Sequence, residues 1–150
     1  MNTIFRHATL DELTTLVDFQ LAMALETEGL RLHKETVERG VSAVFEDSNK
    51  GQYWIAEKNS QVVGNLLIIP EWSDWRNGSV WWIHSVYITP KYRGQGVFRE
   101  MYNALKATVE ASPQLFGLRL YVDQSNINAQ KVYQQLGMTS DHYALFEWLK

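Results

Sequence analysis

The sequence predicts a mixed α/β fold of the α+β kind, in which helices cover the faces of one central sheet. Two early segments carry apolar residues at helical spacing, and the middle of the chain changes to the alternation typical of strands. Helices interrupt the strands again only late in the chain, which favours a mixed sheet. With 150 residues, 45% of them apolar, the chain is expected to form one domain, residues 1–150.

The first third of the chain is expected to form a strand and two helices. Residues 4–7 are expected to be a short strand. Thr9 and Glu12 then fit a capping box, and apolar residues recur at helical spacing as far as Leu25, which predicts a helix over about residues 10–25. A second helix is expected at about 34–46.

The remaining elements follow from changes of period and from turn residues. Strands at 52–57 and 61–69, joined by a turn at 58–60, predict an antiparallel hairpin. A loop is expected next, and then a third central strand at 80–88. A helix is expected to begin after Gly96, with one apolar stripe formed by Phe98, Met101, Tyr102, Leu105 and Val109. The last elements are a strand at 118–122, a helix at about 127–136 and a final strand at 142–149.

Composition excludes several classes of function. The net charge of −3 and pI of about 5.8 disfavour a nucleic-acid partner. The absence of cysteine excludes disulfides, a thiol nucleophile and a thiolate metal site. The first 30 residues lack a signal pattern and no apolar run reaches membrane-spanning length, so a cytoplasmic protein without a membrane partner is expected.

Residues 88–98, Ile-Thr-Pro-Lys-Tyr-Arg-Gly-Gln-Gly-Val-Phe, predict an anion-binding site. They lead from an expected strand, through a loop with two glycines, into an expected helix. Glycines let the main chain approach a ligand closely, and the amides at a helix start lie where the helix dipole is positive. Lys91, Arg93 and Arg99 add positive charge. A ligand that carries phosphates fits this pattern.

Two segments together resemble the GNAT superfamily of acyl-CoA-dependent N-acetyltransferases. The superfamily's pyrophosphate loop has the form Gln/Arg-x-x-Gly-x-Gly/Ala, and residues 93–98 supply its first and fourth positions. Residues 126–138 are similar to the superfamily's Asn-x-x-Ala-x-x-x-Tyr-x-x-x-Gly-Phe helix, except that Met138 stands in the last place. The residues that carry these matches are Arg93, Gly96, Asn126, Ala129, Tyr133 and Gly137.

The resemblance implies a fold, a reaction and a set of binding residues. The fold is a GNAT-type twisted, largely antiparallel sheet of about six to seven strands, flanked by about four helices and splayed at the cofactor site. The reaction is direct attack of a primary amine on the thioester of acetyl-CoA, without a metal. The implied cofactor-binding residues are Val86 and Ile88 through their main chain, the loop residues Arg93, Gly94, Gln95, Gly96, Val97 and Phe98, and Asn126.

Phe98 departs from the superfamily's pattern, which has glycine or alanine where the helix comes close to the cofactor. Its amide still offers a hydrogen bond, and its side chain suits the apolar stripe of the helix, so we expect Phe98 to turn into the core. The other outcome is that its ring narrows the site.

The resemblance assigns the acid to Tyr133, whose phenol would protonate the departing thiolate. His84 is the candidate base, on the expected strand 80–88 and on the same side as Trp82, Val86 and Ile88. Glu26, Glu28 and Glu71 are alternative bases. A cluster of Trp72, Trp75, Trp81 and Trp82 suggests either an aromatic pocket for the amine or ordinary core residues.

The acceptor amine, a small molecule or a peptide, is not identified by the sequence, and homodimer formation stays open. A nucleotide hydrolase would need Gly-Lys-Ser/Thr after the loop. A dinucleotide dehydrogenase would need the loop after the first strand of a βαβ unit. A metal hydrolase would need paired histidines, and the histidines are scattered. The remaining alternative is a non-catalytic acyl-CoA-binding sensor or regulatory domain.

Overall fold

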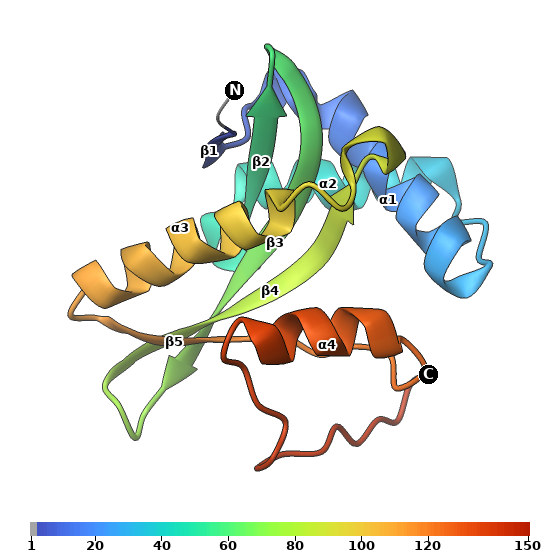
Figure 1. The fold of residues 1–150 in the computed structure, drawn as a ribbon. Helices are drawn as coiled ribbons and strands as arrows, with labels where there is room; N and C mark the ends of the chain where they lie inside the picture. Colours follow the sequence, from blue (N-terminus) through green and yellow to red (C-terminus); the bar gives the residue numbers. More distant parts are fainter. Residues whose placement is uncertain (1–2) are drawn as a thin grey trace. The chain divides into compact units, whose positions relative to one another are not determined.

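The computed structural model describes residues 3–150, which fall into two compact units divided between Arg119 and Leu120. Figure 1 shows the elements of both units. The first contains a five-stranded sheet and three α-helices, and the second contains one α-helix.

The strands of the sheet lie in sequence order. Neighbouring strands are antiparallel except for the last pair, which is parallel. A parallel pair needs a crossover connection, and the third helix supplies it. The strands are β1 (Ile4–His7), β2 (Gln52–Lys58), β3 (Gln61–Ser73), β4 (Gly78–Ile88) and β5 (Leu115–Arg119).

Two capping signals of the sequence flank the first long helix. The predicted capping box is confirmed, since the Glu12 carboxylate accepts from the Thr9 amide at 2.8 Å just before α1 (Leu13–Glu28). Gly29, with φ of 66°, ends that helix in the left-handed conformation. The other helices are α2 (Lys34–Glu46), α3 (Val97–Ala111) and, in the second unit, α4 (Ile127–Gln135).

The two faces of the sheet pack against different helices. Leu16 and Val17 of α1 and Val41 of α2 form one core with Tyr53, Ile55 and Leu67 of the sheet. Helix α3 lies over the opposite face (Figure 1) and buries Val97, Met101 and Leu105. Each face of the sheet therefore has its own apolar layer, as the fold class predicts.

The fold class is confirmed, and the number of strands is corrected. The described residues form five strands instead of six to seven. Residues 142–149 were expected to be a strand and are irregular, because an alternating side-chain pattern forms a strand only where its main chain has a partner. The strand expected at 118–122 lies at Leu115–Arg119, where it pairs with β4. Strand β3 continues to Ser73 and so includes Trp72, which was expected in a loop.

No helix within residues 3–150 combines the length and the apolar character needed to cross a membrane.

Candidate active site

Within the first unit, strand β4 has two neighbouring strands along its first part and one along the rest. Its pairing with β5 runs from Ser79 to Trp82, where Trp82 lies opposite Arg119. Within the first unit, the stretch from Ile83 to Ile88 pairs only with β3. Within the first unit, the second half of β4 thus has one unpaired edge, and main-chain groups on that edge point away from β3.

A β-bulge interrupts this open stretch. His84 pairs with Leu67 and Tyr87 with Asn65, so Ser85 and Val86 together oppose the single residue between those two. Ser85 has φ of 55°, which is uncommon for a residue other than glycine. One extra residue shifts the alternation of side chains along the strand.

The bulge corrects one expectation about His84. Paired residues share a face of the sheet, so His84 faces the same side as Trp82 and Tyr87, not the side of Val86 and Ile88. That side is the one packed by α1 and α2, because Leu67, the partner of His84, belongs to their core.

Two buried amide side chains hold the bulge. Asn65 is 0% exposed, and its Nδ2 donates to the main-chain oxygen of Ser85 at 3.3 Å. Gln20 of α1 is 8% exposed and donates from Nε2 to Oδ1 of Asn65 at 3.2 Å. The bulge is therefore tied to α1 through a buried polar contact.

The glycine loop has the geometry of an anion cradle. Gly94 and Gly96 have φ of 71° and 80°, and no atom lies within 4 Å of the place where a Cβ would stand on either. The amide of Glu100 donates to the oxygen of Gly96 at 3.0 Å, so the amides just before it precede the first hydrogen bond of α3. Amides at a helix start suit phosphate groups, so the loop has the geometry of a phosphate-binding site.

Arg93 lies in the same loop but already has partners. Its Nε donates to the oxygen of Ile88 at 2.8 Å, and its guanidinium forms a 2.7 Å ion pair with Glu26 at the end of α1. The guanidinium carbon also lies 5.3 Å from the centre of the Tyr87 ring. Arg93 thus braces the loop against α1, which the sequence did not indicate.

Phe98 does not begin the buried stripe of α3 as expected. Val97 takes that place and is 2% exposed, whereas Phe98 is half-buried with its ring centre 6.4 Å from that of Tyr102. The buried residues of α3 are Val97, Met101, Tyr102 and Leu105.

A polar cluster extends from His84 toward the paired end of β4. The rings of His84 and Trp82 are stacked with their centres 6.2 Å apart, and burial lowers the pKa of His84. Trp82 Nε1 donates to Glu71 at 2.6 Å, and Arg119 pairs with the other oxygen of Glu71 at 3.1 Å. Sequence reasoning named Glu71 only as an alternative base and missed Arg119, because nothing but the strand register brings these residues together.

The tryptophans do not form one pocket. Trp81 pairs with Pro70 and Trp82 with Ile69, so these neighbours point to opposite faces of the sheet. Trp72 and Trp75 are exposed, at 65% and 91%.

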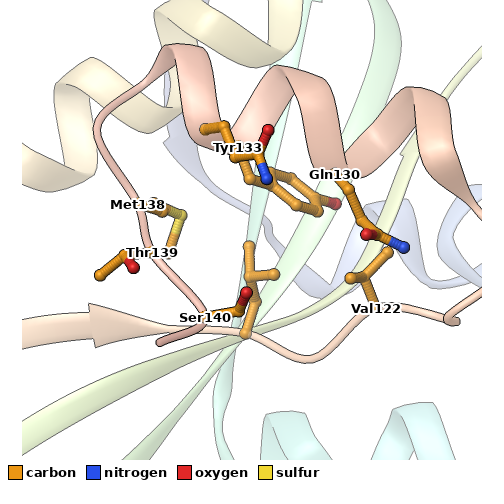
Figure 2. Close-up of a pocket in the computed structure, with 8 residues that line it drawn as sticks. Val122, Gln130, Tyr133, Met138, Thr139 and Ser140 are labelled. Carbon is orange, nitrogen blue, oxygen red and sulfur yellow. The ribbon is translucent and has the colours of Figure 1, made fainter. Parts of the chain in front are cut away.

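The second unit contains the remaining candidates. Asn126 caps α4, since its Oδ1 accepts from the amide of Ala129 at 3.1 Å. Tyr133 points from α4 toward the segment that carries Val122 and lines a pocket of about 120 Å³ (Figure 2). Burial raises the pKa of Tyr133, so its phenol keeps its proton. The pocket is also lined by Leu120, Gln130, Gln134, Met138, Thr139 and Ser140.

The predicted site residues therefore fall into two groups. Strand β4 and the loop after it carry His84, Val86, Ile88 and residues 93–98, and the second unit carries Asn126 and Tyr133. Across residues 3–150, no group of three or more His, Cys, Asp or Glu side chains could hold a metal ion.

Comparisons with known proteins identify the family. The crystal structure of a possible acetyltransferase from Clostridium difficile 630 is 36% identical, with a TM-score of 0.93 over 100% of this chain and 99% of that one. A predicted acetyltransferase with acetyl-CoA from Clostridium acetobutylicum is 20% identical, with a TM-score of 0.73 over 97% and 96% of the two chains.

A third solved structure, ribosomal-protein-alanine N-acetyltransferase from Brucella melitensis biovar Abortus 2308, is 12% identical, with a TM-score of 0.81 over 99% and 100% of the two chains. At this identity the likeness concerns the fold alone. No curated protein matches the chain. Residues 19–138 match the acetyltransferase (GNAT) family, and the chain belongs to that family.

Proposed function

We propose that this protein transfers the acetyl group of acetyl-CoA to a primary amine. One observation carries the proposal: the open, bulged stretch of β4 leads directly into a glycine loop at the start of α3. Such a strand end offers main-chain groups to an extended ligand arm, and such a loop offers amides to its phosphates.

The binding residues are those of β4 and the loop. The amides from Gly94 to Phe98 would hold the diphosphate, and the main chain of Val86 and Ile88 would pair with the pantetheine arm as an added strand does. An amide beside the bulge would polarise the acetyl oxygen. Coenzyme A supplies the acetyl group as a thioester when it is bound. Asn126, at the start of α4, would hold the cofactor or the loop.

The acceptor must lose a proton before it can attack. An alkylamine with a pKa near 10.4 is protonated at pH 7, and neutralising it costs about 4–5 kcal/mol. His84 takes that proton, directly or through water, because burial lowers its pKa and keeps the ring in its basic form. The nitrogen–carbon bond then forms as the carbon–sulfur bond breaks, and Tyr133 gives its proton to the departing sulfur. The nitrogen loses a second proton as it becomes an amide, and a proton from solvent restores the Tyr133 phenol.

The second candidate function is a non-catalytic acyl-CoA sensor, and one observation favours it. Phe98 is half-buried beside the cradle in place of the glycine or alanine usual in the family. A ring at this place could restrict the ligand without preventing binding.

Release of free thiol from acetyl-CoA with a panel of amines tests the proposal. The wild type is expected to release thiol only when an amine is present. Tyr133→Phe should lower turnover roughly 10- to 10³-fold through loss of one proton donor, while coenzyme A affinity measured by calorimetry changes little. Tight binding with no amine-dependent thiol release would instead establish the sensor.

A further inference from the structure

We propose that Glu71 binds the acceptor as an alkylammonium ion, beside Trp82 and His84. The acceptor is then a small primary amine that arrives with its positive charge. This inference rests on the proposed acetyl transfer and adds the acceptor's chemical class and the residue that selects it.

The strand register places these side chains on one face of the sheet. Ile69 lies opposite Trp82, and Glu71, two residues further along β3, shares the face of Ile69. His84, two residues after Trp82, faces the same side, and Arg119 pairs with Trp82 from β5. Glu71 and His84 therefore flank Trp82 on one side of the sheet.

The carboxylate of Glu71 is oriented and still has room for a ligand. One oxygen accepts from Trp82 Nε1 at 2.6 Å and the other from Arg119 at 3.1 Å. A carboxylate offers about four acceptor positions, so each oxygen can take a further donor. The Glu71 side chain is 44% exposed, which leaves it open to a solute.

The charge of Glu71 points to an ammonium group. A carboxylate is an acceptor-only anion, and an ammonium is a compact donor with three N–H groups. The Trp82 N–H and the Arg119 guanidinium hold the two carboxylate oxygens in place for such a donor. An amine bound here lies on the same face as the base that must deprotonate it.

The ion pair between Glu71 and Arg119 is a poor candidate for a purely structural role. Pairs that are this exposed contribute roughly 0–1 kcal/mol to stability. Variants of either residue should therefore fold, and their kinetics can be compared.

The test compares two acceptors with the variant Glu71→Gln. For an alkylamine that is cationic at pH 7.5, the variant should raise KM about 10- to 100-fold, the range for loss of a charged hydrogen bond. For an aromatic amine such as 4-methoxyaniline, which is neutral at that pH, KM should change less than about twofold. The KM for acetyl-CoA should not change with either acceptor. Glu110→Gln, on the exposed face of α3, is the matched control.

The variant Arg119→Gln is a second test, in which KM for the alkylamine should change in the opposite direction. Removing the competing guanidinium should lower KM for the alkylamine about two- to fivefold, the scale of an exposed ion pair. A purely structural ion pair would make both variants move KM in the same direction or leave it unchanged, and either outcome overturns the inference. A loss of kcat with unchanged KM in Glu71→Gln would make Glu71 a base and also overturn it. If the wild type binds coenzyme A but acetylates neither amine, the proposed function fails instead.

Discussion

Replacing Asn65 by leucine should destabilise the first unit strongly, because the change leaves two polar groups without their partner. Gln20 Nε2 loses its acceptor at 3.2 Å and the Ser85 oxygen loses its donor at 3.3 Å. A buried group left unsatisfied costs about 1–3 kcal/mol. Gln20 is buried and bears this cost in full, whereas the Ser85 contact is only partly buried and water can replace part of it. We therefore expect the free energy of unfolding to fall by about 2–4 kcal/mol.

Urea unfolding followed by tryptophan fluorescence measures this loss, with Asn103→Ala on the exposed side of α3 as the control. The double variant Gln20→Leu/Asn65→Leu removes both partners of the buried contact and should recover part of the loss. If the free energy of unfolding of Asn65→Leu lies within about 0.5 kcal/mol of the wild-type value, as is usual for neutral surface changes, the buried contact does not hold the bulge.

Two further predictions concern the loop and the base. Gly96→Ala places a Cβ in open space at φ of 80°, so the free energy of unfolding should fall by about 1–2 kcal/mol in thermal unfolding. The free energy of coenzyme A binding, measured by calorimetry, should fall by more than this. A variant that binds coenzyme A as tightly as the wild type would exclude the loop as the phosphate site. Burial lowers the pKa of His84, so the folded state binds its proton less readily than the unfolded state, and stability should decline as pH falls below about 6.5. The same shift predicts that kcat/KM falls as pH drops below about 6.5, because His84 then becomes protonated. If kcat/KM of His84→Gln still falls in this way, the base is another residue.

The sequence predicted most elements because capping residues, glycines and periodicity act locally. The capping box at Thr9 and the turn between β2 and β3 are examples, and both lie where they were expected. The motif residues from Arg93 to Gly96 likewise lie in a loop before a helix, as predicted.

The face of His84 could not be predicted, because its cause is not local. Period-2 alternation assumes an unbroken ladder, and Ser85 carries no sign that it adopts a left-handed conformation. The contact that holds it comes from Asn65 on β3, which is tied in turn to Gln20 on α1. Similarly, Glu71 and Arg119 are 48 residues apart and meet only through strand register. The sequence therefore named His84 as a candidate base but could not show which residues surround it.

The bulge also explains how the unpaired edge of β4 in the first unit can be tolerated beside the proposed ligand site. An unpaired edge invites another strand, which would need a long regular run of main-chain partners. On β4 the open stretch runs only from Ile83 to Ile88 within the first unit, and Ser85 breaks its regularity in the middle. A second strand would therefore find few consecutive main-chain groups to pair with. A ligand arm that forms only a few hydrogen bonds on either side of Ser85 does not need a regular run, so the bulge does not weaken its binding. The buried contact between Asn65 and Gln20 maintains this selectivity, since without it the strand could relax into a regular edge.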